Sequence, residues 1–319
     1  MSLQFKGEKM EFKHIPVLLD DVIAGLNIKS DGIYVDCTMG GGGHSSAILK
    51  KLSKDGRLIG FDKDMDAVKV CKEKFKDYEN VTVVHSDFKR APLVLQEMGI
   101  CAIDGFLIDL GVSSYQIDNA ERGFSISNDG RLDMRMDREQ ELDAYYVVNN
   151  YSKEELLRIL YQYGEESNAK KIVENILNAR KIKPIVTTGQ LKAIIEDSFP
   201  KSVVYGKGGV SKKTFQAIRI EVNGELDGLK SLLDEMIGLL KSGGRGAVIS
   251  FHSLEDRIVK DTFKLASTDC ICPPKTPICI CHHKKSAILV NRKPIVAQNQ
   301  EIKANSRSTS AKLRVIEKI

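Results

Sequence analysis

The feature that most constrains the fold of this chain is a run of four glycines at positions 40–43. The run follows a short apolar stretch, 33–35, and one acidic residue, Asp36, and it precedes a segment with helical character. Only glycine lets a backbone turn this tightly and approach a ligand this closely. The unpaired amides at the start of the next helix favour polar or anionic groups. We therefore predict a strand, a ligand-binding turn and a helix, in preference to a flexible hinge.

Three further apolar runs follow the glycine turn at intervals of about one strand and one helix: 57–62, 81–85 and 105–110. Amphipathic helical patterns lie between them. This alternation predicts a parallel sheet that is covered by helices on both faces. Ligands of such sheets bind at the carboxyl ends of the strands. Four acidic residues are expected at that edge: Asp36, Asp62, Asp87 and Asp109.

The alternation stops after the fourth predicted strand. The next strand pattern, 246–251, lies well over a hundred residues further on, and the chain between them carries a polar loop and then helical patterns over about 141–199. We predict a helical domain inserted into the sheet domain. The expected parts are the first part of the sheet domain, 1–112, the insertion, 113–212, and the second part, 213–319.

One long amphipathic helix is predicted to lead back to the sheet. Apolar residues recur every three or four positions from Phe215 to Leu240, and the glycine-containing segment 242–244 is expected to end the helix. A last strand is predicted over 312–319.

Composition limits the class of protein. The chain has 319 residues, of which 42% are hydrophobic, enough for a sizeable core. No apolar run is long enough to span a membrane, and the first residues lack the apolar core of a signal peptide, so we expect a cytoplasmic protein without a membrane partner. The net charge is +5. Residues 282–319 include nine Lys or Arg but two Glu. This basic segment either contacts nucleic acid or is a solvated tail.

The seven cysteines are odd in number, and the absence of an export signal argues against a disulfide framework. Three of them, Cys37, Cys71 and Cys101, lie in or beside apolar runs and are predicted to be core residues. The other four form two Cys-x-Cys pairs at 270–272 and 279–281, followed by two histidines. Zinc sites usually separate paired cysteines by two to four residues. The prediction is therefore no metal, with a zinc site as the alternative to an exposed loop of reduced thiols.

The glycine turn alone does not define the cofactor. Gly40 and Gly42 fit the first two positions of a dinucleotide-binding pattern, but Ser45 occupies the third, so the match to a nicotinamide cofactor is imperfect. Asp62, twenty residues beyond Gly42, is well placed to accept hydrogen bonds from a ribose. A ribose occurs in NAD and in S-adenosylmethionine alike.

Seven segments, in order along nearly the whole chain, closely resemble the RsmH (MraW) family. They are 14–19 (HIPVLL), 36–45 (DCTMGGGGHS), 109–118 (DLGVSSYQID), 122–125 (RGFS), 132–136 (LDMRM), 214–219 (TFQAIR) and 250–257 (SFHSLEDR). The resemblance implies an S-adenosylmethionine-dependent methyltransferase with a Rossmann-like α/β sheet and an inserted all-helical domain. It implies transfer to the exocyclic N4 of a cytidine in the decoding region of bacterial small-subunit (16S) ribosomal RNA, with that RNA or the 30S subunit as partner.

The resemblance also assigns roles to individual residues. Asp62 would bind the ribose, Phe88 would lie beside the adenine, and Asp109 and Gln116 would lie near the methionine end. Asp109 is also the candidate catalytic residue. The complete predicted cofactor set is Gly42, Gly43, His44, Asp62, Phe88, Asp109 and Gln116.

One departure concerns the target base. Many amino-methyltransferases place an aromatic residue shortly after the fourth strand's acid, but here Leu110, Gly111 and Val112 follow Asp109. Three aromatic residues could stack the base instead: Tyr115, Phe124 or Phe251.

Two other hypotheses rest on fewer residues. An NAD-dependent oxidoreductase would use the glycine turn and Asp62, and a non-catalytic RNA-binding protein would use the basic C-terminal segment. The sequence does not define the oligomeric state, and a homodimer is compatible with it.

Overall fold

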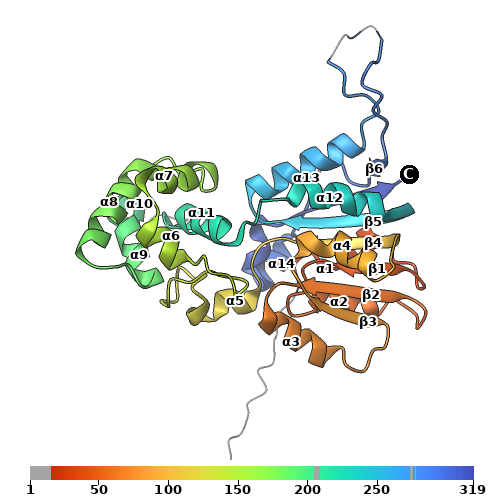
Figure 1. The fold of residues 1–319 in the computed structure, drawn as a ribbon, viewed down its shortest axis with the longest axis horizontal. Coiled ribbons are helices and arrows are strands. Elements are labelled where there is room, and N and C mark those ends of the chain that lie inside the picture. Colours follow the sequence, from red (N-terminus) through yellow and green to blue (C-terminus); the bar gives the residue numbers. More distant parts are fainter. Residues whose placement is uncertain (1–15, 205–208, 274–275, 277) are drawn as a thin grey trace, which may run out of the picture.

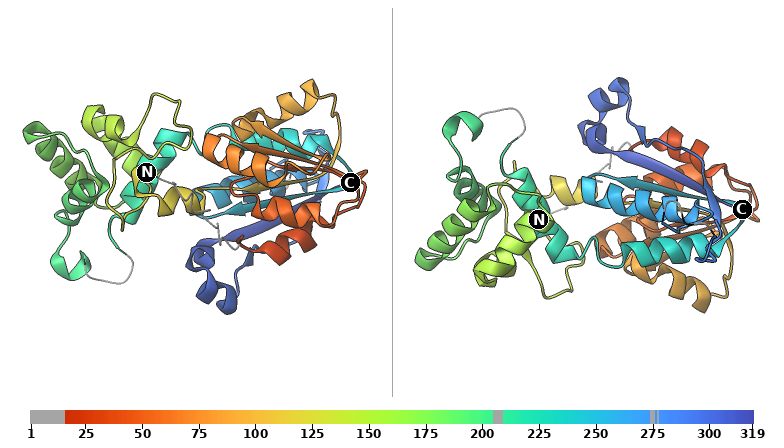
Figure 2. Two further views of the ribbon diagram at one scale, coloured as in Figure 1. Left: turned by 90° about the horizontal axis from the view of Figure 1, so that it is seen from below. Right: turned by 90° about the horizontal axis from the view of Figure 1, so that it is seen from above.

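A computed structural model describes residues 16–204, 209–273, 276 and 278–319. It consists of two lobes, a sheet with helices on both faces and a group of helices beside it (Figure 1). Figure 2 shows the same two lobes from opposite sides, with the last residue at the end of the sheet lobe remote from the helical lobe. His14, Ile15 and the lysine at 207 lie outside the described residues.

The sheet contains eight strands. Five are parallel, in the order β3-β2-β1-β4-β5, and β8 pairs antiparallel with β5, β6 and β7. Four of the parallel strands lie close to the predicted positions, whereas β5 begins at Leu240, six residues before the strand predicted over 246–251. The bounds are β1 Ile33–Asp36, β2 Arg57–Asp62, β3 Val81–His85, β4 Ile103–Asp109, β5 Leu240–Ser250, β6 Ala287–Leu289, β7 Ile295–Val296 and β8 Lys312–Lys318.

Both faces of the sheet are buried, as the nearly continuous apolar strands require. In β4, Phe106 and Ile108 belong to one core, whereas Leu107 between them belongs to the other. The helices α4 (Ala91–Glu97), α12 (Leu229–Leu239) and α13 (Ser253–Ala266) supply the first core. The second is supplied by α1 (Leu19–Leu26), α2 (Gly43–Leu49) and α3 (Met65–Lys74). Short elements complete this lobe: η1 (Phe88–Arg90), α14 (Asn299–Ala304) and η3 (Ser306–Ser310).

The helical lobe is inserted between β4 and α12 and has an apolar core of its own. Capping boxes at Ser152 and Thr187 begin two of its helices. Its elements are α5 Ser114–Asp118, η2 Ala120–Arg122, α6 Ala144–Asn150, α7 Lys153–Gln162, α8 Ala169–Ile182, α9 Thr188–Glu196, α10 Lys201–Val204 and α11 Lys212–Asn223. The structure thus confirms the predicted fold class, an α/β sheet with an inserted group of helices.

The predicted long return helix is wrong, because two helices occupy this stretch. Helix α11 ends before Gly224, at φ 55°, and α12 begins after Gly228, at φ 70°. These left-handed glycines turn the chain between the lobes. Phe215, Ile218 and Val222 of α11 pack in the core of the helical lobe, so the packing favours a lobe boundary near Gly224.

Two smaller expectations are also wrong. Residues 242–244 lie within β5 and do not end a helix, because the chain enters the strand directly from α12 at Leu240. Cys101 is exposed, since it lies in the turn before β4, whereas Cys37 and Cys71 are buried as predicted.

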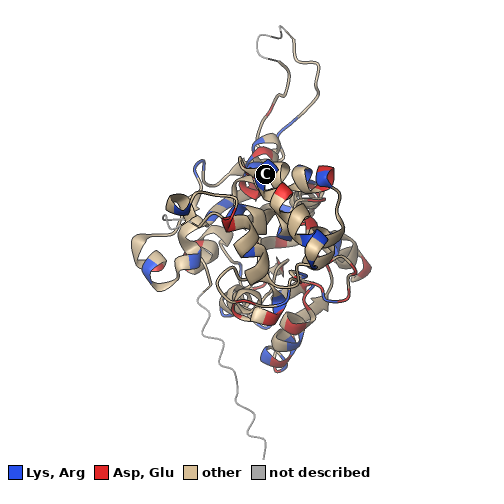
Figure 3. Ribbon diagram, turned by 90° about the vertical axis from the view of Figure 1, so that its left-hand side faces the viewer, with Lys and Arg blue, Asp and Glu red and all other residues tan. Residues whose placement is uncertain are grey.

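The surface of the helical lobe carries charges of both signs. Figure 3 looks onto this end of the molecule and shows Lys and Arg interspersed with Asp and Glu. Two cations of α11 have different surroundings. Lys212 is exposed, but Arg219 forms two hydrogen bonds of 2.8 Å with the Glu225 carboxylate.

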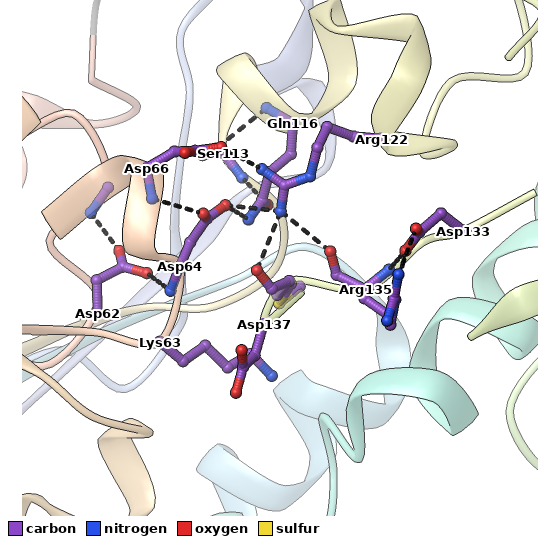
Figure 4. Close-up of polar contacts among 12 residues, drawn as sticks. Asp62, Lys63, Asp64, Asp66, Ser113, Gln116, Arg122, Asp133, Arg135 and Asp137 are labelled. Atoms are coloured by element: carbon purple, nitrogen blue, oxygen red, sulfur yellow. Dashed lines mark hydrogen bonds and ion pairs between the residues drawn. The ribbon is translucent and has the colours of Figure 1, made fainter. Parts of the chain in front are cut away.

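A buried arginine joins the two lobes (Figure 4). The Arg122 side chain is 2% exposed, and its Nη2 lies 2.8 Å from Oδ2 of Asp64, which precedes α3. The same nitrogen donates to the backbone oxygens of Arg135 and Met136, both at 3.0 Å. Gln116 donates from Nε2 to the same Asp64 oxygen at 2.7 Å. The sheet and the insertion therefore share one desolvated charge pair.

Replacing Arg122 with methionine should lower the free energy of unfolding by about 3–5 kcal/mol, because it leaves the Asp64 carboxylate buried without its cation. Urea denaturation measures the change. The matched control is Arg131→Met, since the Arg131 side chain is 66% exposed and only faces Asp143 at 3.7 Å. Such an exposed pair contributes about 0–1 kcal/mol. Equal losses in the two variants would contradict the structural role of Arg122.

Candidate active site

The glycine turn is folded around the buried carboxylate of Asp36. That carboxylate accepts hydrogen bonds from Ser45 Oγ at 2.6 Å and from the Thr38 amide at 3.2 Å. Burial raises its pKa to about 6, against the opposing effect of these two hydrogen bonds. Gly42, at φ 70°, leaves no room for a side chain, because a Cβ there would lie 2.8 Å from the Phe75 ring. Asp36 therefore stabilises the turn from the protein interior and does not point to the side on which a ligand would bind.

A cavity of about 860 Å³ opens at the carboxyl edge of the parallel strands, where the insertion meets the sheet. The turn after β1, the end of β2 and the segments after β3, β4 and β5 all contribute to its wall. Met136 and Glu225 come from later segments of the chain than the loop after β4. They close the side of the cavity that faces the helical lobe. Its other lining residues include Thr38, Gly40, Gly41, Gly43, His44, Asp62, Lys63, Phe88, Asp109, Tyr115, Gln116, Phe251 and Glu255.

Asp62 ends β2 and lies opposite the glycine turn. Its Oδ2 accepts a hydrogen bond from the Gly40 amide at 2.7 Å, and its Oδ1 accepts one from the Asp64 amide at 2.8 Å. Burial raises the pKa of this carboxyl to about 6, although both amides oppose the change. The carboxylate is thus fixed in orientation and still lines the cavity.

Asp109 ends β4 and carries an unsatisfied oxygen. Oδ1 is buried and has no hydrogen-bond partner among the described residues, while Oδ2 lies 3.7 Å from His44 Nδ1. The backbone is held by a 2.6 Å hydrogen bond that the Asp109 amide donates to Thr38 Oγ1. Burial raises the pKa of Asp109 well above its usual value, and the negative charges of Asp36 and Glu255 raise it further. A buried acceptor without a partner is a site at which a ligand cation or amine would gain most.

His44, in the first turn of α2, is 6% exposed. Its Nε2 lies 3.0 Å from the Val17 carbonyl oxygen, so that nitrogen carries the proton and donates. Nδ1 therefore faces Asp109. The contact joins α2 to the segment before α1 and fixes the imidazole against the cavity wall.

The remaining predicted residues differ in position. Gly43 and Phe88 line the cavity, whereas Gly42 lies behind the turn, and Gly40 and Gly41 are exposed to the cavity in its place. Gln116 lines the cavity too, but both ends of its amide are already bound. Its Oε1 accepts from the Ser113 amide at 3.0 Å and its Nε2 donates to Asp64 at 2.7 Å. Gln116 thus holds the loop after β4 in place.

Of the acids expected at this edge, Asp87 does not line the cavity. Its Oδ1 accepts a hydrogen bond from the Lys89 amide at 2.9 Å and so caps η1. Among the three aromatic candidates for base stacking, Tyr115 and Phe251 line the cavity. Phe124 belongs to the core of the insertion, so its proposed stacking role is wrong.

Sequence reasoning assigned no role to a polar cluster after β5. Glu255 is 1% exposed and accepts a hydrogen bond from the Phe251 amide at 2.8 Å. His252 Nε2 and Glu255 Oε1 are 3.1 Å apart, and neither atom makes an aligned hydrogen bond to a described residue. Burial raises the pKa of Glu255, but His252 and Arg219 outweigh it and hold the pKa below its usual value. The signal for this cluster was the segment 250–257, which carried part of the family resemblance.

The cavity thus combines a fixed acceptor at Asp62 with open space over Gly40 and Gly41, where a Cβ would meet no atom within 4 Å. It also holds two carboxyls whose pKa values are shifted in opposite directions, Asp109 upwards and Glu255 downwards. Such an arrangement suits a ribose-containing ligand with a cationic end and a reaction that creates positive charge.

Several known proteins are similar to this chain along most of its length. The model of the MraW methylase family matches residues 11–319. The ribosomal RNA small subunit methyltransferase H of Clostridium botulinum is 53% identical over 97% of this chain and 100% of that protein. The protein of the same name from Caldicellulosiruptor saccharolyticus is 54% identical over the same shares. A solved rRNA methylase from Streptococcus thermophilus covers 94% of this chain and 93% of that one, at 13% identity and a TM-score of 0.39.

The family match covers nearly the whole chain and confirms the resemblance carried by the seven segments. It also decides between the three hypotheses that the sequence left open, since an oxidoreductase and a non-catalytic RNA-binding protein are not methylases. The chain belongs to the MraW methylase family.

Proposed function

We propose that this methylase transfers a methyl group to the exocyclic N4 of a cytidine in the decoding region of small-subunit (16S) ribosomal RNA, in the cytoplasm. The observation that supports the proposal best is the unsatisfied oxygen of Asp109 in the cavity at the carboxyl edge of the sheet. Related proteins named ribosomal RNA small subunit methyltransferase H support the RNA and the subunit as substrate.

S-adenosylmethionine is the cofactor, and when bound it supplies a methyl group activated on a positively charged sulfur. Asp62 would accept hydrogen bonds from the ribose, because its two amide contacts fix the carboxylate and leave further acceptor positions toward the cavity. Phe88 offers an apolar face for the adenine. Gly40, Gly41 and Gly43 let the backbone lie close to the ligand.

Asp109 would act where positive charge develops. The amine of cytosine is a weak nucleophile, because its lone pair is delocalised into the ring, and its nitrogen becomes positive as the new bond forms. A carboxylate oxygen aimed at an amine hydrogen then binds the transition state more strongly than the ground state. The alternative role is an anchor for the ammonium group of the cofactor. Either role requires the ionised carboxylate.

The insertion would form the RNA side of the site. Met136 and Glu225 close the cavity there, and Tyr115 and Phe251 offer flat rings near Asp109 for the target base. Lys63 and Lys89 hold the turn between the lobes, donating to the backbone oxygens of Asn223 at 3.3 Å and Gly224 at 2.8 Å. The RNA-facing wall is thereby tied to β2 and η1 on the cofactor side.

Nucleoside mass spectrometry tests the proposed product. Purified protein, S-adenosylmethionine and 30S subunits from cells without this enzyme should yield N4-methylcytidine, located by sequencing to the decoding region. A methyl group on cytosine C5 or on another nucleoside would contradict the proposal.

Cofactor affinity should depend on pH through Asp62. Because its folded pKa is about 6, lowering the pH from 7 to 5 protonates most of the carboxyl and removes acceptor capacity, which should weaken S-adenosylmethionine binding roughly tenfold. Calorimetry measures the affinity. Asp62→Asn should bind weakly at pH 7 and show a flatter pH dependence. The same tenfold change in that variant would assign the titration to another group.

Asp109→Asn should slow single-turnover methylation by roughly a hundredfold or more at saturating cofactor and RNA, the scale expected for a group that assists proton removal. The matched control is Asp87→Asn, which lies just beyond the end of β3 and outside the cavity wall, and it should retain its rate. A near-normal rate for Asp109→Asn once both ligands are saturating would leave Asp109 as a binding residue only.

A further inference from the structure

We propose that Cys270, Cys272, Cys279 and Cys281 form a structural zinc centre. They lie in the segment 267–286 between α13 and β6, which extends away from the sheet lobe (Figure 1). The segment is remote from the helical lobe. None of the four cysteines lines the methyltransferase cavity, so the centre is a separate site.

The four sulfurs have the spacing of ligands around one tetrahedral ion. Their Sγ–Sγ distances are 3.6 Å for Cys270–Cys279, 3.8 Å for Cys270–Cys281, 4.0 Å for Cys272–Cys279 and 3.5 Å for Cys279–Cys281. All four sulfurs lie within 4.8 Å of one another. A zinc–sulfur bond of about 2.3 Å in tetrahedral geometry separates the sulfurs by about 3.8 Å. The observed spacing fits this value, and all four cysteines are free thiols rather than disulfides.

The short Cys-x-Cys spacing, which argued against zinc in the sequence, has a structural explanation. In extended chain, residues two apart point to the same side, so both sulfurs of a pair can face one ion. The described residues around both pairs lie outside helices and strands. The two arms of the loop thus bring one pair each to a common point, and the four sulfurs come from two directions.

The segment has no apolar core that could order it. Among its described residues none is buried, and Ile271, Ile278 and Ile280 are 51%, 76% and 72% exposed. The base of the loop is held by contacts to the end of α13, where Ser286 donates its amide to the Ala266 oxygen at 2.9 Å. Toward the tip, the sulfur cluster joins the two arms. An ion bound there would supply the ordering that hydrophobic burial does not.

The ligand set indicates a structural centre. Four thiolates complete a tetrahedral shell and leave no position for water or substrate. The nearby His283 ring is engaged elsewhere, with Nε2 at 3.0 Å from the Leu265 oxygen. Binding would release the thiol protons, and the resulting negative charge lies beside Lys284 and Lys285 in the sequence.

The test measures metal in the full-length protein purified without chelators from cells supplied with zinc. Elemental mass spectrometry should find about one zinc per chain. The double variant Cys272→Ser/Cys279→Ser should lose at least nine-tenths of it. Cys101→Ser, which removes an exposed thiol outside the cluster, should retain all of it. Cobalt(II) added to the metal-free wild type should produce the visible absorption of a tetrahedral thiolate centre, and the double variant should not.

Three outcomes would overturn the proposal. They are a wild-type protein that binds neither zinc nor cobalt, a double variant that retains its metal, and intact mass spectrometry showing disulfides among these four cysteines in freshly purified protein. Because the wild-type metal content is measured directly, the test does not depend on whether the variants fold.

Discussion

The buried ion pair between Arg122 and Asp64 is the contact on which the geometry of the cavity depends. Asp64 follows Asp62 by two residues, and its backbone amide is one of the two groups that orient the Asp62 carboxylate. On the other side, Arg122 binds the Met136 carbonyl oxygen, and the Met136 amide donates to Asn223 at 2.8 Å. Asn223 is the last residue of α11. A continuous set of hydrogen bonds therefore links the proposed ribose site to both segments that cross between the lobes. Because every member is desolvated, a break anywhere leaves an unpaired polar group.

Two acidic residues that line the cavity, Asp109 and Glu255, have opposite electrostatic surroundings. Asp109 has only other acids as charged influences on its pKa, and its burial favours the neutral form. Glu255 is more deeply buried, with a side chain 1% exposed against 26% for Asp109, but His252 and Arg219 favour its charged form. A positively charged ligand beside Asp109 would favour the charged form of the carboxyl over the neutral form. Cofactor binding and proton release from Asp109 should therefore be coupled. A bound cation would thus favour the charged form of Asp109, the form that accepts hydrogen bonds.

The sequence predicted those parts of the structure that depend on local pattern. The parallel strands, the glycine turn and the acids at the ends of β2 and β4 follow from apolar periodicity and from the restricted conformations that only glycine adopts. The sequence analysis failed where contacts between distant segments determine the structure. The apolar residues have the same spacing on α11 and α12, so the periodicity predicted a single helix. The two helices pack in different lobes. Gln116 was expected near the methionine end of the cofactor; it lines the cavity, but its amide also binds Ser113 and Asp64, which no local pattern indicates. The sulfur cluster likewise depends on contact between two arms of a loop, and the spacing of the cysteines within one arm does not predict that contact.

Helix α13 connects the cavity to the cysteine loop. It begins at the capping box formed by His252 and Glu255, beside Asp109, and ends at Ala266, where the loop starts. Its fourteen residues span about 21 Å, so the proposed zinc centre lies far beyond the reach of direct electrostatic influence on the cavity. The helix is fixed independently at the sheet, because Val259 and Phe263 are buried in its core and Asp256 forms an ion pair of 2.7 Å with Arg314 of β8. Loss of metal would therefore alter the loop without moving the catalytic end of the helix.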